Sequence, residues 1–266
     1  MSEPLPPSAE IIGRALEVDG AYTGARLGVL ERIPGNPVGV SVRREGQAWA
    51  FACRVLPVVS FNRVVGLTDA ALVPDLIAWF AEWGDRPRFE IAPGEDAEAV
   101  ERALAAAGFA QLGEFHATLY GRPTPAPPRA SGVTVEDVDH GNLETFLDAH
   151  VAGWQVSGGE QFKANVRPWI DQPGWRLFIG RYDGRPAGAA TLFIQDGVGY
   201  CADSAVDPAL RGHGVHQALL RRRIEVSLQA GCDLVCAQAR YLSTSHRNMV
   251  RAGLQLLHSR TAWTRL

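Results

Sequence analysis

A glycine-bearing turn near position 212 constrains the fold of this chain more than any other feature. A strand-like run from Val198 to Val206 leads into the turn, and a long helical pattern follows it and ends near Gly231. The first N–H groups of a helix have no partner within the helix, and the helix dipole adds partial positive charge there. Because Gly212 and Gly214 carry no Cβ, an anionic group can approach the main chain closely. The sequence therefore predicts a phosphate-binding turn between a strand and a helix, and a plain glycine turn is the alternative.

Two common phosphate-binding motifs do not fit this turn. The dinucleotide fingerprint requires a third glycine three residues after the second, but position 217 is Gln, and the P-loop requires a Gly-Lys-Ser/Thr sequence that is absent here. The turn does resemble motif A of the GCN5-related N-acetyltransferases, Arg/Gln-x-x-Gly-x-Gly/Ala. It reads Arg211-Gly-His-Gly-Val-His216 in this chain. His216 departs from the small residue usual at the sixth position and makes the wall of the turn bulkier.

A second segment adds to the resemblance. After the long helix, an apolar run from Asp233 to Ala239 predicts a buried strand. The segment from Ser243 to Leu254 begins with a helix-cap composition and ends in Ala-Gly-Leu, where Gly253 suits a left-handed C-cap. Its Ser245-His-Arg-Asn248 sequence is similar to that of one subgroup of the family. A final strand is predicted from His258 to Leu266.

An internal repeat predicts two domains. Residues 100–122 and the end of the chain each read as a helix that ends in Ala-Gly-Phe or Ala-Gly-Leu and is followed by a strand. The two glycines, Gly108 and Gly253, are separated by about one domain length. A Pro-rich stretch separates the copies and is expected to be extended and stiff. We therefore expect one domain at 1–122, a linker at 123–130 and a second domain at 131–266.

The first copy lacks the glycine turn. Its strand run spans Trp49 to Leu67, and Pro74 to Trp83 is the copy of the long helix. The connection Gly66-Leu-Thr-Asp-Ala-Ala71 has no Arg-x-x-Gly-x-Gly pattern, and Asp69 would repel a pyrophosphate. We expect residues 1–122 to form a degenerate acetyltransferase-like domain without acetyl-CoA, with a structural or substrate-forming role. An unrelated α+β domain is the alternative.

The second copy reads as an alternation of strands and helices. Strands are predicted at 133–138, 175–179, 187–194 and 199–206, helices at 142–154 and 160–170, and a hairpin turn at Asp183–Pro186. The resemblance implies the fold class, which is an α+β chain with mixed sheets. It consists of two tandem acyl-CoA N-acyltransferase-like domains, each with a twisted, mostly antiparallel sheet flanked by helices.

The resemblance implies acetyl-CoA as the co-substrate and assigns its contacts by position. In this family the pantetheine arm pairs with the strand before the turn, and the turn binds the pyrophosphate. The expected cofactor-binding residues are Ser204, Ala205, Val206, Arg211, Gly212, His213, Gly214, Val215, His216, Gln217, Ser245 and Asn248. Solvation of Arg211 and an N-cap role for Ser245 are the structural alternatives. His213 and His216 have the spacing of a metal pair, but no carboxylate accompanies them, and we expect no metal.

The catalytic base is less well defined. A main-chain N–H near Ser204 would face the oxygen on which negative charge develops during acyl transfer. Many relatives place a glutamate base where this chain has Tyr200, which is not a base at neutral pH. Asp203 is the nearest carboxylate, although strand alternation would turn it to the opposite face. Ser204 and Asp203 are therefore the candidate catalytic residues.

The acid and the acceptor site rest on still fewer residues. Many relatives protonate the thiolate with a tyrosine at the position of Met249, for which Ser245 and Tyr241 are possible substitutes. A thiolate can also leave without an acid. Trp154 and Phe162 flank a Gly-Gly loop where this fold admits the acceptor, and plain packing is the alternative for both aromatic side chains.

Composition limits the class of protein. The chain has 266 residues, 46% of them hydrophobic, and a formal charge of −3, which argues against a nucleic-acid binder with a basic face. No apolar run reaches the ~18 residues of a membrane span, and the start of the chain has no secretory signal pattern. We therefore expect a cytoplasmic protein. Four cysteines in a chain of this length do not make a disulfide framework, and Cys232 and Cys236 are expected to be buried thiols rather than metal ligands.

Together these features predict an acetyl-CoA-dependent N-acetyltransferase that acts on a small-molecule or protein amine by direct attack in a ternary complex. A non-catalytic acyl-CoA-binding regulatory module is one alternative, and an acyltransferase that uses a longer acyl-CoA is another. The sequence leaves open the acceptor and the oligomeric state, because a fold does not fix either of them.

Overall fold

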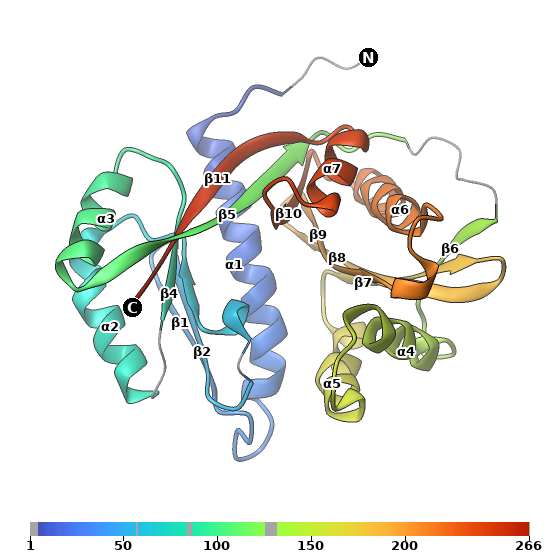
Figure 1. Cartoon of the computed structure of the whole chain (residues 1–266), viewed down its shortest axis with the longest axis horizontal. Coiled ribbons are helices and arrows are strands. Elements are labelled where there is room, and N and C mark those ends of the chain that lie inside the picture. Colours follow the sequence, from blue (N-terminus) through green and yellow to red (C-terminus); the bar gives the residue numbers. More distant parts are fainter. Residues whose placement is uncertain (1–4, 57, 84–86, 126–131, 266) are drawn as a thin grey trace. The chain divides into compact units, whose positions relative to one another are not determined.

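The computed structural model describes residues 5–56, 58–83, 87–125 and 132–265. The described residues divide into two compact units: an N-terminal unit within 6–118 with residues 257–265, and a C-terminal unit within 119–256 with Leu5. Each unit contains a mixed, mostly antiparallel sheet flanked by helices, which confirms the predicted fold class (Figure 1). Residues 126–130 of the predicted linker lie outside the described residues.

The N-terminal unit has three α-helices and a sheet among its described residues. They are α1 (Ala9–Glu31), α2 (Val73–Glu82), α3 (Ala97–Ala106), β1 (Val40–Glu45), β2 (Ala48–Cys53), β3 (Arg63–Val65), β4 (Arg88–Ile91) and β5 (Phe109–Gly121). The strands lie in the order β1-β2-β3-β4-β11-β5, where β11 (Gln255–Arg265) is the last strand of the chain. The pair β3–β4 is parallel, whereas β1–β2, β2–β3 and β4–β11 are antiparallel.

Strand β2 shows why this sheet has helices on both faces. Successive side chains of a strand point to opposite faces of the sheet. Ala50 belongs to the core that includes Phe80 of α2, while the next residue, Phe51, belongs to a separate core that includes Leu27 of α1. Because both faces of β2 are apolar, each face needs a helix to cover it.

Helix α1 and strand β1 were not predicted from the sequence. Ser8 caps α1 by accepting a hydrogen bond of 3.3 Å from the N–H of Ile11. The buried residues of α1 include polar ones such as Asp19 and Thr23, so the helix shows no simple apolar stripe to detect. No helix in the described part of the chain, α1 included, is both long and apolar enough to cross a membrane.

The C-terminal unit contains the glycine turn. Its elements are β6 (Val133–Asp137), α4 (Leu143–Trp154), α5 (Gly159–Val166), β7 (Trp175–Tyr182), β8 (Arg185–Gln195), β9 (Val198–Val206), α6 (Val215–Gln229), β10 (Leu234–Arg240) and α7 (Thr244–Arg251). The strand order is β10-β9-β8-β7-β6, and only the pair β9–β10 among these is parallel. Helices α4 and α5 lie on one side of β7 and β8, and α6 lies on the other (Figure 1).

Most predicted elements of this unit are present at the expected positions. One difference is the second helix, predicted at 160–170, which ends at Val166 and continues as a 3₁₀ turn over Arg167–Asp171. Pro168 explains the difference, because proline has no N–H to donate within an α-helix. The hairpin turn has Asp183 and Gly184 at φ values of 46° and 76°, as a two-residue turn of the primed type requires. All four cysteines are buried.

The two copies in the sequence repeat one order of elements: β1-β2-β3-α2-β4-α3-β5 in the first copy and β7-β8-β9-α6-β10-α7-β11 in the second. Gly108 and Gly253 follow the corresponding helices α3 and α7 with φ values of 82° and 96°. The last strand departs from the boundaries expected from the sequence. Strand β11 pairs with β4, for instance Trp263 with Phe89, so residues 257–265 belong to the N-terminal unit rather than to a domain at 131–266.

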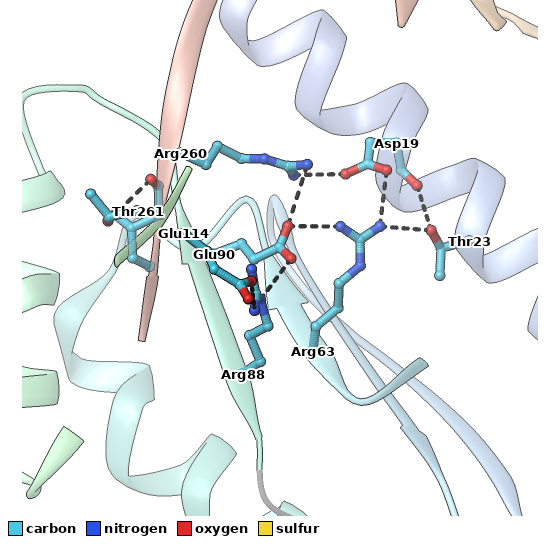
Figure 2. A network of polar contacts seen from close by, with 9 residues as sticks. Asp19, Thr23, Arg63, Arg88, Glu90, Glu114, Arg260 and Thr261 are labelled. Atoms are coloured by element: carbon cyan, nitrogen blue, oxygen red, sulfur yellow. Dashed lines mark hydrogen bonds and ion pairs between the residues drawn. The ribbon is translucent and has the colours of Figure 1, made fainter. Parts of the chain in front are cut away.

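A buried network of ion pairs fixes β11 in the N-terminal unit (Figure 2). Arg260 of β11 lies 2.8 Å from Asp19 and 3.3 Å from Glu90, and Arg63 lies 2.9 Å from each of the same two carboxylates. Burial raises the pKa of Glu90, but the charges of Arg260 and Arg63 outweigh it and lower that pKa to about 2. The same balance keeps the pKa of Asp19 below its usual range. Both carboxylates are therefore ionised at neutral pH.

Candidate functional site

A cleft of about 520 Å³ lies in the C-terminal unit, at the end of β9 and beside the N-termini of α6 and α7. Its lining residues come from four segments: Gly153, Trp154, Gln155; Ser204, Ala205, Val206; Leu210, Arg211, Gly212, Gly214, Val215, His216, Gln217; and Thr244, Ser245, Asn248. None of these described lining residues is a carboxylate, and Arg211 is a cation. The cleft therefore suits an anionic ligand better than a cationic one.

The glycine turn forms one wall of the cleft. Gly212 and Gly214 have φ values of 88° and 85°, in the left-handed region that glycine adopts without steric cost. Gly214 is the N-cap of α6 and carries no side chain that could cap the helix, and the N–H of Ala218 bonds to the carbonyl of Gly214 at 3.0 Å. The earlier N–H groups, including those of His216 and Gln217, have no partner within the helix and lie beside the cleft.

Strands β9 and β10 separate next to this turn. Their parallel pairing runs from Val198 and Leu234 to Cys201 and Ala237 in the described residues. Beyond that point, Ser204–Val206 of β9 line the cleft instead. Main-chain groups on this side of β9 can therefore pair with an extended ligand as a further strand would.

Helix α4 closes the cleft behind β9. A Cβ at Gly153 would lie 2.7 Å from the Cβ of Ala205, so only glycine allows the helix to approach the strand this closely. Gly153 and Gln155 were not predicted as site residues, and neither were Leu210 and Thr244. Leu210 adjoins the predicted Arg211, and Thr244 adjoins the predicted Ser245. Extending each predicted segment by one residue would therefore have included them. Gly153 reaches the cleft through packing of α4 on β9, for which the sequence carries no signal.

The two candidate catalytic residues form a β-bulge in β9. The register places Ala189 opposite Ala205 and Thr191 opposite Ala202, so the single residue between them on β8 faces both Asp203 and Ser204. Asp203 has a φ of 39°, and simple strand alternation therefore does not decide where its side chain points. Asp203 is not among the residues that line the cleft.

Ser204 does line the cleft, and its side chain is notable there. The Oγ atom is buried and has no hydrogen-bond partner among the described residues. A buried hydroxyl without a partner is costly, so a polar group of a ligand would be favourable at this position. Contact between this stretch of β9 and a bound molecule stays a prediction.

His216 connects the first turn of α6 with α7. Its Nδ1 lies 3.3 Å from Nδ2 of Asn248, and its Nε2 lies 3.5 Å from Oγ of Ser245. Because the amide of Asn248 donates, Nδ1 accepts, and the proton of a neutral imidazole is on Nε2. Burial, together with the charge of Arg223, lowers the pKa of His216 to about 4. The ring is therefore neutral at pH 7 and adds no charge to the cleft.

Three predicted side chains of the turn and of α7 have other contacts. The ring of His213 stacks on Tyr182 with centroids 4.1 Å apart, and His213 does not line the cleft. Arg211 lines the cleft and donates from Nε to the carbonyl of Val206 at 3.2 Å. The N-cap of α7 is Ser243 rather than Ser245, so the structural alternative for Ser245 was wrong.

The aromatic pair predicted for the acceptor site is divided between two places. Trp154 lines the cleft and is 50% exposed. Phe162 packs edge-to-face on His150 at 5.1 Å and does not line the cleft. Tyr200 and Met249, at the positions where relatives place a base and an acid, are buried outside the lining. The cleft therefore has neither a catalytic base from position 200 nor a catalytic acid from position 249.

The N-terminal unit has a different connection at the corresponding place. Gly66 follows β3, and a Cβ there would lie 2.5 Å from the carbonyl oxygen of Gln47, so this glycine serves close packing. Asp69 then caps the next turn with its own carboxylate, which accepts from the N–H of Ala71 at 2.9 Å. This 3₁₀ turn (Ala70–Leu72) continues directly into α2 at Val73, whereas Gly212 and Gly214 lie between the corresponding turn (Pro208–Leu210) and α6.

Comparisons with known proteins agree with this geometry. The sequence model of the acetyltransferase (GNAT) family matches residues 141–248, which run from the start of α4 into α7. No curated protein matches the chain in sequence.

Several solved structures are similar over nearly the whole length. A GCN5-related N-acetyltransferase from Kribbella flavida is 16% identical, with 94% of this chain and 96% of that chain covered and a TM-score of 0.64. A GCN5-related N-acetyltransferase from Sphaerobacter thermophilus is also 16% identical, with 96% of this chain and 91% of that chain covered and a TM-score of 0.60. A tandem GNAT protein from the clavulanic acid biosynthesis pathway is 14% identical, with 98% and 96% covered and a TM-score of 0.62. At these identities the likeness shows a shared fold.

Proposed function

Since the chain belongs to the GNAT superfamily and is an acyltransferase of that type, we propose that it transfers an acetyl group from acetyl-CoA to an amine by direct attack in a ternary complex. One observation carries the proposal: the open N-terminus of α6 and the separated end of β9 line the same cleft. The first suits a pyrophosphate, and the second suits an extended arm with amide groups.

The residues of the cleft divide into two binding regions. The N–H groups from Gly212 to Gln217 would hold the pyrophosphate, with Arg211 adding positive charge. The main chain from Ser204 to Val206 would pair with the pantetheine arm. Ser245 and Asn248 of α7 border the same cleft and are fixed against His216. His213 would contribute its main-chain N–H only, because its ring stacks on Tyr182.

Acyl transfer in this cleft would depend mainly on positioning. The amine nitrogen forms a bond to the carbonyl carbon, the carbon–sulfur bond breaks, and the sulfur leaves as a thiolate. The N–H of Ser204 would donate to the carbonyl oxygen as negative charge develops there. Holding both reactants in contact can supply several kcal/mol of the barrier reduction, so a dedicated acid is not essential.

The acceptor would enter beside Trp154, which is exposed at the edge of the cleft. No carboxylate of the described lining is in position to deprotonate an ammonium group. We therefore favour an amine that reaches the cleft already neutral and loses its extra proton to water after attack. Asp203 at the bulge is the remaining candidate base, and Phe162 would support Trp154 through His150.

We further propose that the N-terminal unit is a degenerate copy without acetyl-CoA. The direct continuation of the 3₁₀ turn into α2, with no glycine turn between them, and the ion pair between Arg63 of β3 and Glu90 of β4 support this proposal. The ion pair bridges two parallel strands that correspond to β9 and β10, which separate in the other unit.

A panel of small-molecule and peptide amines, with release of free thiol from acetyl-CoA as the signal, tests the function. Turnover with at least one amine, together with its loss in Gly214→Asp, is expected. Tight acetyl-CoA binding without turnover on any amine would favour a regulatory acyl-CoA-binding module. A higher kcat/KM with hexanoyl-CoA than with acetyl-CoA would favour a longer acyl chain.

A further inference from the structure

The bulge in β9 has a buried arginine bound to it. Arg223 comes from α6 and is 1% exposed, although its neighbours Leu219, Leu220 and Ile224 form an apolar face. Its Nη1 donates to the carbonyl of Ala202 at 2.9 Å and to the carbonyl of Thr191 at 3.1 Å. Burying a guanidinium group is costly unless it is well hydrogen-bonded. A specific task at these two carbonyls would explain why an arginine is present.

The two carbonyls lie where the regular ladder ends. Ala202 and Thr191 are the last pair in register before β9 gains its extra residue. A bulge leaves ladder groups without their regular partners, and a buried carbonyl needs a replacement donor. Arg223 supplies that donor to one carbonyl on each strand. Its Nε also bonds to the carbonyl of Leu219 at 3.1 Å, which fixes the side chain against its own helix.

We propose that Arg223 is a positioning residue for acyl transfer, which holds the bulge at Asp203 and Ser204 so that the main chain of Ser204–Val206 faces the cleft in the productive register. The inference rests on the proposed function. Without the two hydrogen bonds, β9 can lose the bulge and pair regularly with β8. Because side chains alternate along a strand, a shift of one residue moves every following group to the other face.

The position of the guanidinium near the cleft agrees with this role. Its charge acts on His216, where it contributes, after burial, to the lowered pKa of about 4. Arg223 thus has an effect on both walls of the cleft, the bulge in β9 and the first turn of α6, without lining the cleft itself.

The test compares Arg223→Met with Arg222→Met in the full-length protein. Both substitutions remove a guanidinium from α6, but Arg222 bonds to Asp137 and Glu225 instead of the bulge. We expect kcat of Arg223→Met to fall about 10-fold to 100-fold, as for a displaced oxyanion donor, while the Kd for coenzyme A changes less than about 3-fold because the glycine turn is intact. Arg222→Met is expected to retain wild-type kcat.

Hydrogen exchange of the free protein gives a second measurement that does not need activity. Amides of residues 202–206 are expected to exchange faster in Arg223→Met, whereas those of β7 keep their rates. Arg223→Lys, with a single donor atom, is expected to recover part of kcat, and it takes the place of Arg223→Met if that variant does not fold.

Two results would overturn the inference: unchanged kcat in a folded variant, or a loss of kcat without a change in exchange at 202–206. Failure of the proposed function has a different signature, since the wild-type protein would then show no turnover at all. In that case faster exchange at 202–206 would show that Arg223 holds the bulge, but its role in acyl transfer would be overturned.

Discussion

Arg260 donates a hydrogen bond of 2.8 Å to the carboxylate of Asp19, which lies 241 residues earlier in the chain. Both side chains are 1% exposed, and Arg63 binds the same carboxylate from β3 at 2.9 Å (Figure 2). The last strand of the chain is therefore fixed in the N-terminal unit by charges from three separate elements. A buried ion network of this kind is expected to specify which strand pairs with β4.

Removing one charge from this network should destabilise the N-terminal unit. Asp19→Asn leaves Arg63 and Arg260 buried with only one of the two carboxylates that they share, and we expect a loss of about 3–5 kcal/mol in the free energy of unfolding. Glu17→Gln on the same helix is the control, because Glu17 forms a partly exposed pair with Arg44 that contributes about 0–1 kcal/mol. Chemical denaturation of both variants measures the difference, and equal losses would contradict a special role for Asp19.

The free energy of unfolding should fall on mild acidification, at pH values above those at which the buried carboxylates become protonated. Burial, with help from Arg223 and Arg260 respectively, lowers the pKa values of His216 and His258 from 6.5 to about 4. The unfolded chain binds these protons near pH 6.5 and the folded chain does not, so unfolding becomes easier as the pH falls from 6.5 to 4. We expect each histidine to lower the free energy of unfolding by roughly 2–3 kcal/mol over this pH range. Glu90 has a pKa of about 2 in the folded chain, so its protonation lowers the free energy of unfolding further below about pH 4.5.

The measurement is the denaturation midpoint between pH 7 and pH 4. His216→Asn and His258→Asn should each flatten this profile. A profile that stays flat down to pH 4.5 in the wild-type protein would contradict the lowered pKa values.

Gly214→Asp should weaken acetyl-CoA binding by at least about 100-fold, because a carboxylate at the N-terminus of α6 repels the phosphates. Gly231→Asp is the matched control, since Gly231 follows the other end of α6 with a similar positive φ of 76°. Any strain from a left-handed aspartate is then common to both variants. Calorimetry should show wild-type affinity for the control. Equal affinities in the two variants would mean that the turn holds no phosphate.

The full-length protein should bind one acetyl-CoA per chain. The connection before α2 lacks the glycine turn that Gly212 and Gly214 form before α6, and this difference supports a single site. Intact protein is required, because a cut at residue 122 would separate β11 from the unit in which it pairs. A stoichiometry of two, or a site that survives in Gly214→Asp, would contradict the degenerate copy.

Asp203→Asn should retain most of kcat/KM, within about 3-fold, if the amine enters neutral. The ascending limb of the pH–rate profile should then follow the acceptor, so that two amines of different pKa give limbs displaced by the same difference. A limb that stays in place for both amines and disappears in Asp203→Asn would identify Asp203 as the base.

The glycine turn could be predicted because its signals are local. A strand, two glycines and a helix within about thirty residues determine the direction of the main-chain N–H groups, and Gly212 and Gly214 have the left-handed conformation that this geometry needs. The same holds for the repeat, whose copies have the same order of elements. The sequence by itself therefore determined the fold class and the glycine turn that forms one wall of the cleft.

The tertiary structure alone decided three other features. Strand β11 reads as the end of the second copy, but buried charges on α1, β3 and β4 hold it in the N-terminal unit. Asp203 and Ser204 lie on a bulge whose extra residue shows only when β8 is placed beside β9. Arg223 reads as one of three consecutive arginines, yet only this one is buried against two carbonyls. Each feature depends on contacts between separate elements of the chain, which no local pattern of residues encodes.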